Sequence, residues 1–330
     1  MYIIKSESTN AYFNIALEEY LINNFDEEFF ITAVNEPSII VGAHQYTYDE
    51  INVLYVKQNN VKVVRRLSGG GTVFQDHGNI NFSHIYYDDG SAVNDFSKVC
   101  NIILNFVREK LELESEFAGR NDLVIDDKKF SGHARLKIDG KILHHGTLLV
   151  SSNMKSLVDA LKFNSEKYAD RALRSNHERV TNLAEHLEDM YSVEKVFELF
   201  LNYIRSIYPE AVLYNLSKED IDNVNKLVEE KYSTWEWNFG QELGLPLYNT
   251  GANKYGNYEL YLKEEEGKIE QVRIFGDFFS KRPMSEIEEK LIGCNLRKKS
   301  VISALSSLDF NNYMSGIELE EFAATFEKND

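Results

Sequence analysis

The chain has 330 residues, 43% of them hydrophobic and 27% charged, which is typical of a globular protein with one sizeable core and a smaller second domain. Its 36 Lys and Arg face 53 Asp and Glu, a formal net charge of −17, which argues against nucleic-acid binding because that needs a basic surface. Apolar runs stay below the roughly 18 residues of a membrane span, the N-terminus has no signal-peptide layout, and two cysteines are too few for a disulfide framework or a cysteine-based zinc site. We therefore expect a cytoplasmic protein without a nucleic-acid or membrane partner.

The first predicted element is an amphipathic helix over residues 9–24, with Thr9 as its N-cap and apolar side chains at helical spacing. Two later helices are expected, one capped by Asp95 that buries Cys100, and one over residues 189–208. Short apolar runs rich in β-branched residues predict strands at residues 29–34, 38–41, 61–64, 79–87, 123–125 and 143–150. Because strands and helices do not alternate in a regular βαβ rhythm, the predicted fold class is α+β with a mixed or antiparallel sheet.

A domain boundary is predicted at residues 243–256, where glycine and proline accumulate. Beyond it, alternating polarity on both sides of Glu266-Gly267 predicts a hairpin, and helices are expected to follow at about residues 285–292 and 298–308. The predicted domains are therefore a large one over residues 1–244 and a small α/β domain over residues 250–330.

Three consecutive glycines follow one of the predicted strands, within the segment Arg65-Arg66-Leu67-Ser68-Gly69-Gly70-Gly71-Thr72-Val73-Phe74. Glycines allow the backbone to approach a ligand closely and to present N–H groups to phosphate oxygens. The two arginines could pair with phosphate in bidentate fashion. The segment is not a Walker loop, since no Gly-Lys-Ser/Thr follows. A flexible turn with solvated arginines is the alternative, and the strand placement favours the ligand-binding interpretation.

A second candidate segment runs from Gly119 to Gly132 and holds two charged residues of interest. Asp122 could be a ligand of Mg²⁺ on phosphate oxygens, because that ion prefers carboxylate oxygen. Lys129, which precedes Phe-Ser-Gly, could be held over a reacting centre as a fixed positive charge. Taken alone, however, Asp-Asp-Lys-Lys over residues 126–129 is more typical of a solvated hairpin tip.

A pair of histidines, His144-His145, stands in a predicted strand before Gly146. Adjacent residues of a strand point to opposite faces, so the two rings cannot easily share one metal ion. Histidines that are satisfied by hydrogen bonds in the sheet, with one ring near a ligand, are the better interpretation. Cys100 lies in an apolar helical stripe and Cys294 is remote from these segments, so neither thiol is predicted to be a nucleophile.

Together these segments resemble the lipoate–protein ligase family, in their order and approximate spacing and over essentially the whole chain. The residues that carry the resemblance are Arg65-Arg66-x-Ser68-Gly69-Gly70-Gly71-x-Val73-Phe74, Asp76-x-Gly78-Asn79, Gly119-Arg120-Asn121-Asp122-Leu123, Lys129-x-Ser131-Gly132, His144-His145-Gly146-Thr147-Leu148-Leu149, Arg179-Val180-Thr181-Asn182-Leu183 and Trp235-Glu236-Trp237-Asn238-Phe239-Gly240.

The resemblance implies the fold of biotin and lipoate ligases, which is related to the catalytic domain of class II aminoacyl-tRNA synthetases, followed by a C-terminal accessory domain. It also implies a two-step reaction in which lipoate and ATP with Mg²⁺ give lipoyl-AMP, and a lysine of an apo lipoyl-domain protein then displaces AMP. The implied acceptors are the glycine-cleavage H protein and the E2 subunits of 2-oxoacid dehydrogenases.

The resemblance further implies roles for individual residues, with Lys129 as the central catalytic charge and Asp122 as the Mg²⁺ ligand. The residues implied for ATP and lipoyl-adenylate are Arg66, Gly71, Thr72, Val73, Phe74, Asn121, Asp122 and Lys129. Those implied for lipoate are Gly70, Lys129 and His145. A lid is expected over residues 164–176, with Lys167, Arg171 and Arg174 among its charges. This chain departs from many relatives at Gln75 and at His133, both expected beside the acyl pocket.

Two alternatives remain. An octanoyl or lipoyl transferase of the same superfamily would take its acyl group from a carrier protein, and the cysteine-dependent versions need a thiol at the ligand. A non-catalytic acyl- or nucleotide-binding protein would bind its ligand without releasing pyrophosphate. A biotin ligase is disfavoured, because its glycine loop is of the Gly-Arg-Gly-Arg type.

Overall fold

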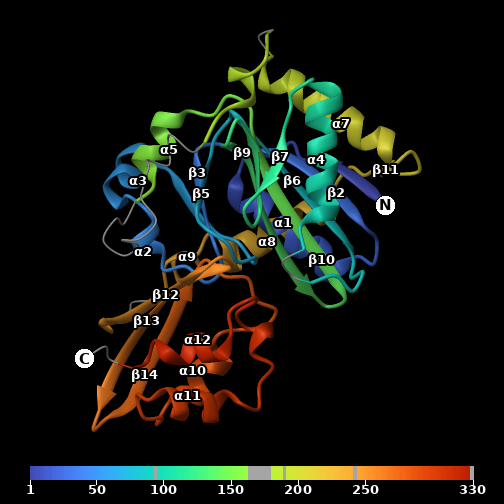
Figure 1. Ribbon diagram of the computed structural model, residues 1–330. Coiled ribbons are helices and arrows are strands. Elements are labelled where there is room, and N and C mark those ends of the chain that lie inside the picture. Colours follow the sequence, from blue (N-terminus) through green and yellow to red (C-terminus); the bar gives the residue numbers. More distant parts are fainter. Residues whose placement is uncertain (93–94, 163–179, 189–190, 241–243, 328–330) are drawn as a thin grey trace.

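A computed structural model describes residues 1–92, 95–162, 180–188, 191–240 and 244–327 of the chain. These residues form one eight-stranded mixed sheet, a small three-stranded sheet beside it, and a separate three-stranded sheet near the C-terminus, with helices packed around them (Figure 1). The predicted α+β class is confirmed. Within the described residues no helix is both long and apolar enough to cross a bilayer.

The eight-stranded sheet has the order β11-β1-β2-β6-β10-β9-β8-β7. Its pairs are antiparallel except at one edge, where β1 lies parallel to both β2 and β11. The strands are β1 (Tyr2–Lys5), β2 (Phe29–Val34), β6 (Asn79–Tyr87), β7 (Glu116–Ala118), β8 (Asp122–Ile125), β9 (Lys128–Ile138), β10 (Lys141–Leu149) and β11 (Val212–Leu213).

Each face of this sheet has its own helices because successive strand residues point to opposite sides. On one face Ile31, Ile85 and Leu143 pack in a hydrophobic cluster with α1 (Ala11–Asn24) and α8 (Lys218–Leu227). On the other, Phe30 and Phe82 belong to a second cluster with α4 (Ser97–Lys110) and α7 (Val193–Ile207), which lie side by side (Figure 1). The sheet is therefore a partition between two cores.

The smaller sheet of the large domain, in the order β4-β3-β5, carries the glycine-rich segment. Its strands are β3 (Ser38–Val41), β4 (Lys62–Arg65) and β5 (Val73–Gln75), so the glycines connect two strands that flank β3. The remaining helical segments of this domain are α2 (Thr47–Glu50), α3 (Val53–Asn59), α5 (Met154–Ala160), a 3-10 turn (Leu183–Glu185), a π-helical turn (Val228–Tyr232) and α9 (Trp235–Asn238).

The C-terminal sheet packs its strands in the antiparallel order β12-β13-β14 against short helices and has a hydrophobic cluster of its own. The predicted hairpin is confirmed, with Glu266 and Gly267 at positive φ between β13 and β14, as a tight hairpin turn requires. The elements are β12 (Leu247–Asn253), β13 (Gly256–Glu265), β14 (Lys268–Gly276), α10 (Ser285–Leu291), α11 (Lys298–Leu305), a 3-10 turn (Phe310–Asn312) and α12 (Leu319–Ala324).

The helix starts differ from prediction by a few residues. Asn10, not Thr9, caps α1 by accepting from the Tyr12 N–H at 3.1 Å. Asp95 lies one residue before the N-cap of α4, although its carboxylate still accepts from the Ser97 N–H at 3.0 Å. Helix α7 begins at Val193 behind the Ser192 cap, and the predicted start at residue 189 lies outside the described residues.

Candidate active site

Two cavities of about 280 and 460 Å³ adjoin each other where the glycine-rich loop meets strands β8, β9 and β10. The residues that line both are Thr72, Val73, Asp122, Lys129 and Thr147. Two ligand fragments placed in these cavities would therefore meet beside the one lysine and the one carboxylate of this shared edge.

Lys129 lies at this junction because of a bulge in the β8–β9 hairpin. Asp126 and Asp127 form the tip, both at positive φ, as predicted for a solvated turn. The register between β8 and β9 then shifts by one residue at Phe130. Lys128 is exposed, whereas the Lys129 Nζ lies 2.8 Å from Asp122 Oδ1. The segment thus forms the expected hairpin tip and also brings Lys129 to the edge that the two cavities share.

Gly132 explains the Lys-x-Ser-Gly spacing. A Cβ at this position would lie 2.7 Å from both Cε and Nζ of Lys129, so the lysine side chain lies across a residue that must lack a side chain. The lysine backbone is also fixed, since its carbonyl accepts from the Thr181 N–H at 2.9 Å. The segment after residue 179 therefore helps to position β9, and its Val180 also lines the larger cavity.

The two arginines before the glycine loop, which the sequence suggests as possible partners for phosphate, have different partners in the structure. The Arg65 guanidinium is buried and donates to backbone carbonyls, including those of Gly42 at 2.9 Å and Gln45 at 2.7 Å. It also donates to the Thr47 hydroxyl at 2.6 Å. Within the described part of the chain, the lining of the two cavities does not include Arg65. Its side chain joins the small sheet to α2 and to the Trp237 carbonyl of α9, 3.1 Å away.

Arg66 lines the smaller cavity and holds the glycine loop in shape. Its Nη2 donates to the carbonyls of Gly69 at 2.7 Å and Gly71 at 2.9 Å, and its Nε donates to Ser68 Oγ at 3.1 Å. Burial lowers the pKa of Arg66 to about 10, which still leaves the side chain charged at neutral pH. Gly70 allows the turn itself, because its φ of +89° is a conformation that favours glycine.

A buried hydrogen-bonded chain connects the loop to helix α1. The Glu18 carboxylate accepts from His145 Nδ1 at 3.0 Å, and His145 Nε2 lies 2.6 Å from Ser68 Oγ. A carboxylate can only accept, so Nε2 is assigned as the acceptor for the Ser68 hydroxyl, which in turn accepts from Arg66. This series of hydrogen bonds from Glu18 to Arg66 therefore runs in one direction, with each donor assigned.

Sequence reasoning missed Glu18, and a signal for it was present. Asn14 and Glu18 are four residues apart on a helix that is otherwise apolar where buried, and both line the smaller cavity. Two buried polar residues on one helical face indicate a polar ligand or network. The apolar part of this cavity is formed by Ile15, Ile31, Ala33 and Ile40.

The C-terminal sheet also contributes to the site, through the segment that follows β14. Asp277 lines the smaller cavity, and its carboxylate lies 3.4 Å from a guanidinium nitrogen of Arg120. The Phe278 carbonyl approaches Gly69 so closely that a Cβ there would lie 2.2 Å from it. Nothing in the local sequence indicated that residue 277 would reach the site, because the contact depends on how the two domains pack.

The other predicted residues fall as follows. Gly71, Asn121 and His145 line the smaller cavity and Phe74 the larger one. Gly70 lines neither cavity within the described part of the chain, although it forms the loop. The two departures from the family pattern, Gln75 and His133, both line the smaller cavity. The predicted lid at residues 164–176, with Lys167, Arg171 and Arg174, lies outside the described residues, as does Arg179.

Two family descriptions match the chain: the Lipoyl protein ligase A/B catalytic domain over residues 10–205 and the Bacterial lipoate protein ligase C-terminus over residues 247–326. Similar proteins include the lipoate-protein ligase LplJ of Bacillus subtilis, 36% identical over 316 residues that cover 94% of each chain. Lipoate–protein ligase 1 of Staphylococcus aureus is 36% identical over 327 residues, which cover 97% of this chain and 98% of that protein.

Solved structures with a similar fold include LipL1 of P. falciparum in complex with lipoate, with a TM-score of 0.75 at 23% identity, covering 93% of this chain and 94% of that chain. The bi-partite lipoate protein ligase of Thermoplasma acidophilum, described with its E2 lipoyl domain, gives a TM-score of 0.63 at 26% identity, covering 72% of this chain and 96% of that chain. The fold expected from the resemblance is confirmed by these matches.

Proposed function

Because the chain belongs to the lipoate–protein ligase family, we propose that it activates lipoate with ATP as lipoyl-AMP and transfers the lipoyl group to a lysine of an apo lipoyl-domain protein. In the first step a carboxylate oxygen of lipoate bonds to the α-phosphorus while the bond to pyrophosphate breaks. In the second step the lysine amine bonds to the acyl carbon, AMP leaves, and the amine proton passes to solvent.

The observation that carries this proposal is the shared edge of the two cavities. A carboxylate attacking a phosphate brings two anions together, and Lys129 is the cation at that edge. A fixed ammonium group beside the reacting atoms stabilises the developing charge in a site closed to water. Asp122, at 2.8 Å, holds the amine in position. We assign Lys129 as the catalytic charge in both steps.

We assign the smaller cavity to the acyl chain. Its aliphatic wall, which includes Ile15, Ile31 and Ile40, suits a medium-length hydrocarbon. His145 and Gly71 line the same cavity and would contact lipoate. Gly70 would act through the shape of the loop, since the described cavity lining does not include it.

We assign the larger cavity to the nucleotide. Phe74, Leu149 and Leu157 give it apolar walls for a flat base, and Thr72 and Lys129 bring polar groups to its edge with the acyl cavity. Arg66 and Asn121 line the acyl cavity on the other side of this edge. They would face the α-phosphate of the adenylate from there, and Val73 contributes to both walls.

Asp122 fits a magnesium ion in its chemistry, since a hard carboxylate oxygen suits that ion and the side chain is 38% exposed at the edge of the nucleotide cavity. Asp122 would hold Mg²⁺ against phosphate oxygens. When bound, the ion would neutralise charge on the triphosphate. Lys129 and the loop N–H groups would orient the reacting oxygen.

For acceptors we propose the apo glycine-cleavage H protein and the E2 subunits of 2-oxoacid dehydrogenases. The T. acidophilum relative, described with an E2 lipoyl domain, supports this class. A net charge of −17 means that an acidic acceptor would gain no long-range attraction. Either local cations near the junction guide docking, for which the exposed Lys128 is a candidate, or association relies on short-range fit.

The test is incubation of the purified chain with ATP, Mg²⁺, lipoate and a panel of apo acceptor domains, read by intact mass. We expect one lipoyl group on one acceptor lysine, with pyrophosphate released only when lipoate and ATP are both present. Octanoate and a lipoylated peptide in place of lipoate define the acyl preference. Equal lipoylation without ATP would contradict the proposal.

The same experiment separates the ligase from a cysteine-dependent transferase. Cys100 is 1% exposed, and it belongs to the core on the α4 face of the sheet, away from Glu18 and His145. Burial and the nearby Asp122 raise the pKa of its thiol well above the usual range. A thioester-linked acyl group on either cysteine would favour the transferase instead.

A further inference from the structure

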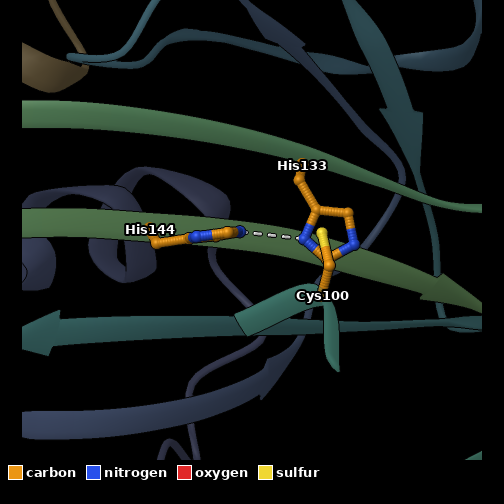
Figure 2. A group of neighbouring side chains, drawn as sticks. All are labelled: Cys100, His133 and His144. Carbon is orange, nitrogen blue, oxygen red and sulfur yellow. Dashed lines mark hydrogen bonds between the residues drawn. The ribbon is translucent and has the colours of Figure 1, made fainter. Parts of the chain in front are cut away.

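A cluster of three potential metal ligands lies on the α4 side of the large sheet, opposite the Glu18–His145 side. Cys100 comes from α4, His133 from β9 and His144 from β10, and their ligand atoms all lie within 4.8 Å of one another. Figure 2 shows the His144 ring pointing at the His133 ring, with the Cys100 sulfur beside it. All three residues are at most 3% exposed.

The two histidine rings face each other through one nitrogen atom each. His133 Nδ1 lies 3.0 Å from His144 Nε2, and the far nitrogen of the same His133 ring lies 3.1 Å from Ser131 Oγ. His144 Nδ1 has no hydrogen-bond partner among the described residues. The rings of Phe82 and Phe96 each lie 5.5 Å from one histidine, and His133 also lines the smaller cavity.

We propose that this cluster binds one thiophilic metal cation, Zn²⁺ or Cu⁺, through Cys100 Sγ, His133 Nδ1 and His144 Nε2. Thiolate and imidazole are the ligands these ions prefer, and a hard cation such as Mg²⁺ finds no oxygen ligand in the set. On binding, the thiol proton leaves to solvent and a sulfur–metal bond forms. Ser131 Oγ then accepts from the outer nitrogen of His133, which orients that ligand as in known metal sites.

The charge of the ligand set suits this chemistry. His133 Nδ1 and His144 Nε2 lie 3.0 Å apart and face each other, so at least one of these two nitrogens carries a lone pair. A thiolate with two neutral imidazoles gives zero net charge around Cu⁺ and +1 around Zn²⁺. The lower net charge costs less desolvation in a buried site. No fourth Cys, His, Asp or Glu ligand joins the group among the described residues, and three ligands are enough for Cu⁺.

We expect the bound ion to stabilise the fold by linking three of its elements. The ion would connect α4 to β9 and β10, the strands that carry Lys129 and His145 elsewhere along their length. Metal bound to the native chain and not to the unfolded one stabilises the fold by mass action. The predicted readout is therefore stoichiometry and thermal stability, measured independently of ligase activity.

The test equilibrates the full-length chain with Zn²⁺, with Cu⁺ under anaerobic reducing conditions, or with Mg²⁺, removes free ion, and measures retained metal. Co²⁺ serves as an optical probe, because a thiolate ligand gives a near-ultraviolet charge-transfer band. We expect about one equivalent of Zn²⁺ or Cu⁺, none of Mg²⁺, and a rise of roughly 5 °C in Tm with the retained ion. Comparison of the Zn²⁺ and Cu⁺ arms identifies the preferred ion.

Cys100→Ala should abolish the retained metal, the Co²⁺ band and the rise in Tm, whereas Cys294→Ala should change none of them. The Tm without metal shows whether each variant folds, and His144→Gln provides a second test if Cys100→Ala does not fold. Absence of retained metal in the wild type, or equal retention by Cys100→Ala, would overturn the proposal. So would a Co²⁺ complex without the thiolate band.

Discussion

The two basic segments of the site differ in what their charges do. Before the glycine loop, Arg65 and Arg66 are buried and donate to backbone carbonyls or to Ser68. In the β8–β9 hairpin, Lys129 reaches the junction of the cavities, where it forms an ion pair with the Asp122 carboxylate. The comparison teaches that an arginine beside a glycine loop, such as Arg65, can be structural, while the more exposed cation at the cavity junction comes from another strand.

The largest expected effect is on Lys129. Lys129→Ala should lower kcat/KM for adenylation by about 10³-fold, or about 4 kcal/mol, because it removes the fixed charge at the shared edge. Its Tm should change little, since the side chain is 29% exposed. Initial rates of pyrophosphate release over a range of lipoate concentrations, at saturating ATP, measure this ratio. Near-full activity in this variant would remove the distinction between the two segments.

Replacing Arg65 should have the opposite effect to replacing Lys129: it should lower stability and leave ATP binding unchanged. Arg65→Met leaves several buried carbonyls without a donor, so the free energy of unfolding should fall by about 3 kcal/mol. The variant that remains folded should keep its KM for ATP, since Arg65 lines neither described cavity. Urea unfolding and adenylation kinetics on one preparation check both halves. A raised KM for ATP with unchanged stability would instead indicate that Arg65 binds phosphate.

Gly132→Ala tests whether the position of the lysine, and not only its presence, matters. The new Cβ would lie 2.7 Å from the end of the Lys129 side chain, which is flexible enough to move aside. Adenylation should therefore slow by roughly 10²-fold because the amine is displaced, with little loss of stability. Single-turnover rates and Tm together separate displacement from unfolding. An unaffected rate would mean that the observed lysine position is not the reacting one.

The smallest effect is expected at Lys128, the exposed neighbour of Lys129. Lys128→Ala should leave adenylation unchanged and raise the KM for an acidic acceptor domain by about threefold, as exposed charges contribute little. Added salt should narrow the difference, because the Debye length falls from about 30 Å at 0.01 M to about 10 Å at 0.1 M. A loss of adenylation comparable with that of Lys129→Ala would contradict the assignment.

Much of the fold was predictable where periodicity alone decides it. The strands over residues 29–34, 38–41 and 79–87 end at the residues that the apolar runs predicted. Local capping was less predictable, since Thr9 and Asn10 are both good caps and only the backbone path selects the second. The resemblance pointed to Lys129 through Lys-x-Ser-Gly, and the structure places this lysine at the shared edge of the cavities; the room that Gly132 leaves for it could be seen only in the coordinates.

The parts of the site that were missed come from tertiary packing. Glu18 reaches His145 only because α1 covers one face of the sheet. Asp277 reaches the cavity only because the C-terminal sheet packs against the glycine loop. Arg65 was considered as a possible phosphate partner because its backbone partners, carbonyls of residues 42–45 and of α9, leave no signal in the sequence. Sequence patterns identify the residue types of a site but do not show which side chains point into the cavity and which point away from it.

Adjacent phenylalanines mark the joint between the two sheets. Phe278 is buried in the core of the C-terminal sheet, whereas Phe279 is buried in the core around α4, 5.3 Å from the Phe96 ring. The attachment thus does not depend only on the covalent link between the domains. We expect the protein to remain functional when it is produced as two polypeptides divided before Leu247. The two parts would associate through contacts such as that between Phe279 and Phe96. Split-protein complementation, in which restored activity reports reassembly, would test whether these contacts hold the two parts together.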